Sequence, residues 1–119
     1  MLSLALSLLA VPVVLAQGGP DQAAVTRGRS LWTQRACSGC HGIGRKQAGP
    51  DLAGVSQRRT REWIGKFLAN TQEMLNTDST AMALLKEYKG IRMPSPKLPE
   101  PDADAILAFI GSQEAKLKK

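Results

Sequence analysis

The sequence predicts a single small domain built from helices. Apolar residues recur at the three- and four-residue spacing of a helix in several segments, and residues that cap helix N-termini stand before most of them. Beyond its first 16 residues the chain has about a hundred residues, which is the size of one domain. A domain this short has a thin core and usually needs an additional covalent or bound group for stability.

Residues 1–16 form an apolar, leucine-rich run without a charged side chain. Small residues before Gln17 are typical of a signal-peptidase site, and the run is short for a membrane span and contains Pro12. We therefore expect a signal peptide over 1–16, removed on export to the periplasm. No lysine or arginine precedes the run, which would fit a true start upstream of Met1. The alternative is an uncleaved segment that anchors the protein to a membrane.

The first helix is expected over residues 22–36, after a flexible mature N-terminus at 17–21. Asp21 is its expected N-cap. Its apolar or small residues give one stripe that we expect to be buried, made of Ala24, Gly28, Leu31 and Trp32. Glycine inside a helix costs about 1 kcal/mol relative to alanine. Close approach of a second helix would justify this cost at Gly28; the alternative is a glycine tolerated on the surface.

Both cysteines and the only histidine of the sequence stand within one run of five residues, CSGCH, as Cys37, Cys40 and His41. Cys-x-x-Cys-His is the attachment pattern of a c-type haem. Two thiols three positions apart on one helical turn can each add to a vinyl group of the porphyrin, and the imidazole beside the second thiol then lies under the ring. The motif therefore predicts one covalently attached haem c, with His41 as an axial ligand of the iron.

Three other kinds of site would use the same residues. A redox-active Cys-x-x-Cys pair is typical of a βαβ setting, and nothing near Cys37 has the pattern of a strand. A structural zinc site needs four ligands, and the chain has no further cysteine or histidine to complete one. A disulfide between Cys37 and Cys40 would close a very small loop and leave His41 without a role.

A glycine-rich loop without periodicity runs from Gly42 to Pro50. A carbonyl group in this loop can accept a hydrogen bond from the second ring nitrogen of His41 and fix its tautomer, although the residues alone do not identify which carbonyl. Thr60 is the expected N-cap of the next helix, which runs through Asn70.

Trp63 lies on this helix and has one N–H group to satisfy when buried, for which a haem propionate is a suitable acceptor. Arg58 and Arg59 stand before the helix and can balance propionate charge. The alternative for each arginine is a place in a solvated basic loop.

A further short helix is expected between Asn76 and Gly90, with Gly90 as its C-terminal stop. Met82, Leu85 and Tyr88 follow one another at helical spacing within it. We expect this helix to form a side wall of the haem crevice.

Residues 91–101 contain four prolines, and Met93 is the one soft ligand among them. Such proline density excludes a helix or a central strand and predicts a stiff extended segment. A sixth ligand to haem iron requires this stiffness, because the iron should move little between oxidation states. Met93 is therefore the predicted sixth ligand. The alternatives are Met74, near a helix end, and Met82, which we expect in the core.

The last predicted helix covers residues 102–111 and contains Phe109, a natural partner for the Gly28 face of the first helix. Its first turn carries acidic residues, which are favourable at that end. Residues 112–119 are polar, and we expect them to fray. The predicted domain therefore covers residues 22–112, followed by a basic C-terminal tail at 113–119.

The formal net charge of +6 predicts attraction to the acidic docking faces of redox protein partners, or transient association with an anionic membrane surface. A nucleic-acid role would need aromatic residues interleaved with basic ones, which the sequence lacks. We expect no nucleic-acid partner and a monomeric protein.

The chain resembles the small, single-haem class I cytochromes c of bacteria over nearly all of the segment after residue 16. CSGCH is highly specific, and the other matching features follow in the right order and at the right distance. These features are Gly28 with Leu31-Trp32, Gly49-Pro50-Asp51-Leu52, Arg59 with Thr60-Arg61-Glu62-Trp63, Met93-Pro94 and Phe109-Ile110. Arg92 is a departure, because many relatives carry a small or apolar residue there, and it places a charge near the exposed haem edge.

The resemblance implies an all-α class I cytochrome c fold, with three to five helices around one haem and with the N- and C-terminal helices crossing. It implies that the Pro50 carbonyl accepts a hydrogen bond from the His41 ring. It also implies that Trp63 and Arg59 contact the propionates. Further residues expected in the haem pocket are Leu52, Tyr88 and Pro94.

The expected function is one-electron transfer between respiratory-chain partners, without an enzymatic reaction, because no acid–base pair or nucleophile is suggested. Two other classes stay open. A haem enzyme or gas sensor would need a displaceable sixth ligand, and a haem subunit or tethered domain would belong to a larger membrane respiratory complex.

Overall fold

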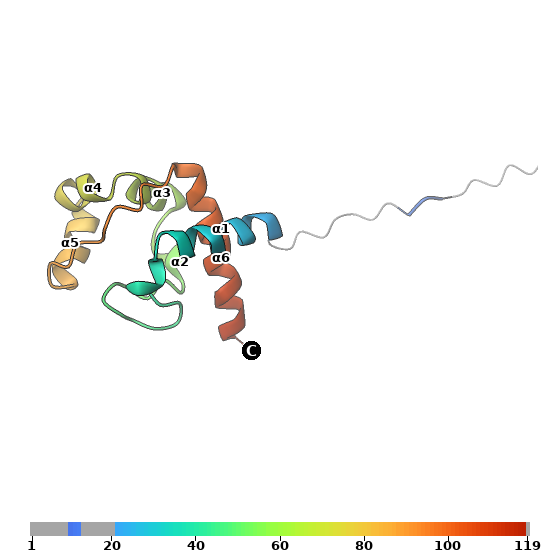
Figure 1. Ribbon diagram of the computed structural model, residues 1–119, viewed down its shortest axis with the longest axis horizontal. Coiled ribbons are helices and arrows are strands. Elements are labelled where there is room, and N and C mark those ends of the chain that lie inside the picture. Colours follow the sequence, from blue (N-terminus) through green and yellow to red (C-terminus); the bar gives the residue numbers. More distant parts are fainter. Residues whose placement is uncertain (1–9, 13–20, 119) are drawn as a thin grey trace, which may run out of the picture.

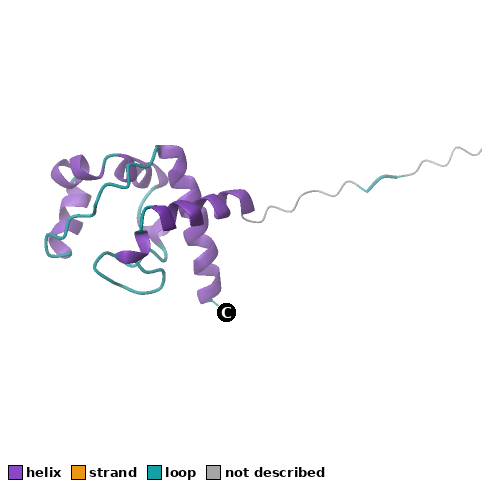
Figure 2. Cartoon of the chain, in the orientation of Figure 1, coloured by secondary structure: helices purple, strands orange, loops and turns teal. Residues whose placement is uncertain are grey.

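The computed structural model describes residues 10–12 and 21–118. Within these residues the chain is helical and contains no strand (Figure 2). The elements, labelled in Figure 1, are α1 (Gln22–Gln34), the 3-10 helix η1 (Cys37–Gly39), α2 (Val55–Arg58), α3 (Arg61–Ala69), α4 (Thr71–Thr77), α5 (Ser79–Glu87) and α6 (Glu100–Leu117). The all-α class is confirmed, with six α-helices in the described part instead of the three to five expected. The predicted segments 1–16 and 17–21 lie outside the described residues, apart from residues 10–12 and 21.

The core lies where the first and last helices cross (Figure 1). The rings of Trp32 in α1 and Phe109 in α6 have their centroids 5.6 Å apart. A Cβ atom built on Gly28 would lie 2.6 Å from the carbonyl carbon of Ala105 and 2.8 Å from the Cβ of Phe109, so only glycine allows this approach. The predicted crossing is therefore confirmed. Val25, and not Ala24, completes the buried stripe of α1.

Two predicted helix starts have their expected caps, and the third predicted helix begins after a cap that was not singled out. The backbone N–H of Ala23 donates to Asp21 at 3.0 Å, and that of Trp63 donates to the hydroxyl of Thr60 at 3.1 Å. Asp78 caps α5 by accepting from the N–H of Ala81 at 2.9 Å. Each side chain satisfies a backbone donor that has no partner inside its helix, which explains why α1, α3 and α5 begin where they do.

Two helices were not predicted, α2 and α4. Helix α4 lies between α3 and α5, and its Thr71 is fully buried, with its hydroxyl donating to the Phe67 carbonyl at 2.6 Å. Helix α5 packs mainly against α4 and not against the α1–α6 core. The core position expected for Met82 was therefore wrong: this residue is 48% exposed.

The C-terminal residues do not fray after Gly111, because α6 continues to Leu117. The backbone N–H of Gly54 donates to the carboxylate of Glu114 at 2.7 Å, and the Leu117 side chain lies against Gly44. These contacts are made to a loop that is distant in sequence, so the polar composition of the tail gave no sign of them.

The opposite end of α6 is held by two ion pairs. Asp102 accepts from Arg27 of α1 at 2.6 Å, and Asp104 accepts from Arg61 of α3 at 2.6 Å. Exposed pairs of this kind contribute little to stability, but they fix α1 and α3 against the same helix. No helix in the described part of the chain is long and apolar enough to cross a membrane.

Candidate haem site

Cys37, Cys40 and His41 lie on one turn immediately after α1. The backbone N–H groups of Cys40 and His41 both donate to the carbonyl of Cys37, at 3.2 and 2.9 Å. Ala36 has a left-handed conformation, with φ of 55°, and separates this turn from α1. Cys37 is half-buried and burial raises the pKa of its thiol, whereas Cys40 is exposed. The expected arrangement of two thiols on one helical turn is present.

The imidazole of His41 is oriented by the loop that follows it. Its Nδ1 lies 2.9 Å from the carbonyl oxygen of Pro50. A carbonyl oxygen can only accept, so Nδ1 carries the proton, and in the neutral ring Nε2 then keeps its lone pair, as a metal ligand requires. The loop is fixed in turn by backbone hydrogen bonds from Gly49 to the Cys40 carbonyl at 2.8 Å and from Leu52 to the Gly42 carbonyl at 3.0 Å. The hydrogen bond that the resemblance implied is thus observed.

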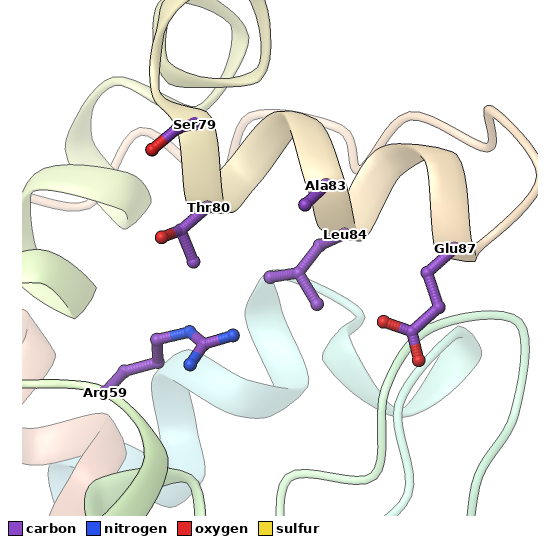
Figure 3. A pocket seen from close by; sticks show the side chains of 6 residues that line it. All are labelled: Arg59, Ser79, Thr80, Ala83, Leu84 and Glu87. Atoms are coloured by element: carbon purple, nitrogen blue, oxygen red, sulfur yellow. The ribbon is translucent and has the colours of Figure 1, made fainter.

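A hollow lies between α5 and the loop that follows His41. It consists of two adjoining cavities of about 300 Å³ each, which share Arg59, Leu84 and Glu87. Figure 3 shows Thr80 and Leu84 of α5 projecting toward the side on which Arg59 lies. Among the predicted pocket residues, the structure brings Pro50, Arg59 and Tyr88 together around the second cavity. The other predicted residues lie elsewhere, with Leu52 packed against the α1–α6 core.

The indole of Trp63 has a partner that the sequence reasoning did not assign. Its Nε1–H donates to Asp78 at 3.0 Å, and its ring stacks on Phe67 with the centroids 5.1 Å apart. The N–H groups of Ala81 and then of Trp63 hold the pKa of the Asp78 carboxyl below its usual value. The guanidinium of Arg59 lies 5.7 Å from the Trp63 ring centroid. Contact of Trp63 with a propionate stays a prediction, and it would compete with Asp78 for the single indole donor.

Arg58 has a different role from Arg59. Its guanidinium donates to the carbonyl oxygens of Ala53 and Asp51, each at 2.7 Å. It therefore holds the backbone of the loop before α2. Arg58 also lines the second cavity, whereas Arg59 lines both.

Met93 and Pro94 belong to the strap, by which we mean residues 91–99, connecting the end of α5 to α6 (Figure 1). Met93 is half-buried and Pro94 exposed, and neither lines the two cavities. The Met93 carbonyl accepts a 2.7 Å hydrogen bond from the side chain of Gln72 in α4. Sequence reasoning missed Gln72, because α4 itself was not predicted.

This set of donors fits a covalently attached haem. Two thiols stand on one turn beside an imidazole whose Nε2 is free, and a thioether stands on a separate proline-rich segment. The close contact of Gly49 with the His41 ring, where a Cβ would come within 2.7 Å of Cε1, shows that the loop is shaped around the imidazole.

Comparison with known proteins agrees with this geometry. The cytochrome c family matches residues 25–114 of the chain. No curated relative matches it. Among solved structures, a cytochrome c from Rhodothermus marinus is 28% identical with a TM-score of 0.71, and the match covers 89% of this chain and 91% of that one.

Two engineered cytochromes c from the same organism are also similar. One is 26% identical with a TM-score of 0.70, and the other, bound to a carbene intermediate, is 27% identical with a TM-score of 0.67. Each match covers 89% of this chain and 90% of the other. The family model matches most of the chain and the CSGCH turn is in place. The chain therefore belongs to the cytochrome c family of electron-carrying proteins with covalently attached haem c, and Cys37 and Cys40 fit its attachment motif.

Proposed function

We propose that the chain is an exported electron carrier with one haem c, in which His41 and Met93 ligate the iron. The observation that carries this proposal is the 2.9 Å hydrogen bond between His41 Nδ1 and the Pro50 carbonyl, which leaves Nε2 free on the same turn as the two thiols. When bound, the haem supplies one-electron oxidation and reduction at its iron.

The protein residues hold and orient this group. The Pro50 carbonyl keeps the His41 ring in one tautomer and raises its basicity as a ligand. Arg59 stands beside the hollow, where its charge can balance a propionate. Leu84 of α5 and the ring of Tyr88, the residue directly after α5, form one wall and limit the access of water.

Met93 is the best candidate for the sixth ligand among the described methionines. It is half-buried, and its carbonyl is bound to α4. Met82 is 48% exposed on α5, which makes it a poor candidate. Met74 is half-buried within α4 and is the remaining alternative.

We further propose that acidic faces of redox partners dock near the hollow. The exposed cations Lys46, Lys86 and Lys89 lie on the loop after His41 and at the end of α5. Lys46 lies 4.9 Å from the ring centroid of Tyr88, which lines the cavity. Electron exchange should therefore slow as ionic strength rises. A monomer in the periplasm, with at most transient association with membranes, fits this function.

The function is tested on the native protein. Its intact mass should show one haem and the loss of residues 1–16, and the ferric protein should show the deep-red charge-transfer band of a thioether–iron bond. Met93→Ala should keep the haem and lose this band, whereas Met74→Ala should keep both.

Several results would contradict parts of the proposal. Colourless protein from a host able to attach haem would overturn it entirely. Rapid carbon monoxide binding to the reduced protein would favour the haem enzyme or gas sensor. Co-purification with membranes and an intact N-terminus would favour a tethered subunit of a larger respiratory complex.

A further inference from the structure

The middle of the strap has almost no backbone partners of its own. Among the described residues, positions 92–97 donate no backbone–backbone hydrogen bond, and two of them, Pro94 and Pro96, lack the N–H to do so. The nearest backbone contacts are from Ile91 to the Tyr88 carbonyl and from Leu98 to the Leu68 carbonyl, both at 3.2 Å. Between these two points, other groups must hold the segment that carries Met93.

Helix α4 supplies these groups. Gln72 donates from its amide nitrogen to the Met93 carbonyl at 2.7 Å and accepts at its amide oxygen from Nε of Arg92 at 3.0 Å. Arg92 also donates from Nη2 to the side-chain oxygen of Asn76 at 2.7 Å. Gln72 and Asn76 stand four residues apart and therefore share one face of α4. Three hydrogen bonds thus join this face to two consecutive residues of the strap.

The face of α4 that makes these bonds is itself fixed in the fold. Its neighbours Thr71 and Leu75 are 0% and 5% exposed. The Thr71 hydroxyl is further bound to the Phe67 carbonyl of α3. Hydrogen bonds from such an anchored helix restrict the strap more than contacts with a mobile loop would.

We propose that Gln72, Asn76 and Arg92 form a clamp that positions Met93 for its bond to the haem iron. The inference rests on the proposed ligation by Met93. The three residues are positioning residues, because none of them is a ligand: they act on the backbone of Met93 and on the residue before it. Arg92, which the resemblance placed near the haem edge, then has its guanidinium group bound to α4, where it holds the strap.

The clamp has a measurable consequence for the sixth position. An added ligand such as imidazole can bind the iron only when the thioether leaves it, and the clamp opposes the strap movement that this requires. When the clamp lacks one hydrogen bond, the equilibrium constant for release of Met93 from the iron should rise about tenfold, the value that corresponds to one typical net hydrogen bond.

The decisive variant in the holoprotein is Gln72→Leu, which is neutral and so leaves the charge around the haem unchanged. We expect haem attachment to persist and the deep-red band to weaken. The apparent affinity of the ferric protein for imidazole should rise by about tenfold or more, because this variant lacks two of the three hydrogen bonds. Asn76→Leu should shift both readouts in the same direction. Asn76→Asp should restore them, because its carboxylate still accepts from Arg92.

Glu73→Gln is the matched control, since this exposed residue is the next one along α4 and makes no side-chain bond to the strap. It should leave imidazole affinity unchanged. If Gln72→Leu folds poorly, Arg92→Lys tests the same clamp from the strap. A lysine keeps the charge but cannot present the planar guanidinium fork to both acceptors, so imidazole affinity should again rise.

The outcomes separate the clamp from the ligation on which it depends. The clamp alone would be overturned if Met93→Ala lost the deep-red band while Gln72→Leu and Arg92→Lys kept the native band and the native imidazole affinity. Lower thermal stability in these two variants with no change in imidazole affinity would also overturn it, since it would show a purely structural role. Met93→Ala that keeps the band would overturn the ligation and the clamp with it.

Discussion

The backbone of Gly49 lies against the edge of the His41 imidazole. A Cβ atom built on Gly49 would be 2.7 Å from Cε1 and 3.0 Å from Nδ1 of the ring. The neighbouring Pro50 carbonyl accepts from the same Nδ1 at 2.9 Å, so the loop fixes the ring by contact and by hydrogen bonding together. No side chain fits at residue 49 unless the ring or the loop moves.

Gly49→Ala should therefore destabilise the protein by about 1–3 kcal/mol, the usual cost of overpacking. The measurement is denaturant unfolding of the haem-loaded protein. Gly39→Ala is the matched control within the same region, because a Cβ atom there would meet nothing within 4 Å. Equal stability of the two variants would show that the contact is not restrictive.

Gly28→Ala should weaken the α1–α6 crossing by about 1–3 kcal/mol, because the new methyl group would overlap the backbone of Ala105. The midpoint and slope of urea unfolding give the change. For Gly111→Ala in α6 we expect the opposite effect. The position is open, so alanine should stabilise the helix, and with it the protein, by about 0.5–1 kcal/mol. If both substitutions stabilised the protein, the close approach at Gly28 would be refuted.

Glu114→Ala should free the loop at Gly54 and cost about 1 kcal/mol, the typical net value of one hydrogen bond. Amide hydrogen exchange reports this contact directly, since the Gly54 N–H should exchange faster in the variant. Glu114→Gln keeps an acceptor and should retain most of the protection. Lys116→Ala, two residues further along α6, is the control and should leave exchange at Gly54 nearly unchanged. Unaltered exchange at Gly54 in Glu114→Ala would argue against the contact.

The stability of the fold should fall at acid pH partly through Asp78. Its pKa is held below the usual value by the N–H groups of Ala81 and Trp63, so the unfolded chain binds a proton there more readily than the folded one. The stabilisation is therefore complete above the unfolded pKa of about 3.9 and is lost as pH falls through the lower pKa of the folded state.

Asp78→Asn tests this linkage. The stability difference between wild type and variant should be largest near neutral pH and should shrink as pH falls below about 4. Urea unfolding midpoints over this range give the difference at each pH. A difference that is the same at every pH would mean that ionisation of Asp78 does not contribute.

The features that could be predicted from the sequence depend on neighbours in the chain. Asp21 and Thr60 cap helices within three residues of themselves. In the CSGCH run, the two thiols and the imidazole are close enough in sequence to share one turn. The crossing at Gly28 and Phe109 was predictable only once the last helix supplied Phe109 as a partner, because a glycine inside a helix can also be a tolerated surface residue. The carbonyl bound to His41 was found only by resemblance, since from the sequence alone any of several carbonyl groups in the loop after His41 could reach the ring.

The features that could not be predicted depend on contacts between distant residues. Trp63 donates to Asp78, and Gly54 donates to Glu114, and neither pair has a local pattern. The polar sequence of the C-terminal residues indicated fraying, but their contacts with the loop stabilise a longer helix. Likewise Gln72 stands on α4, and this seven-residue helix is too short to show a recognisable periodic pattern of apolar residues.

The contact of Gly28 with Ala105 and Phe109 joins nearly the two ends of the domain, and so sets the order in which a newly synthesised chain can close. The core has only one of its two main helices until the C-terminal segment is available to pack. Up to that moment the turn with Cys37 and Cys40 has no closed protein around it. The topology thereby leaves the Cys37 thiol, which is half-buried against this core in the folded protein, fully reachable for thioether formation until the final helix docks.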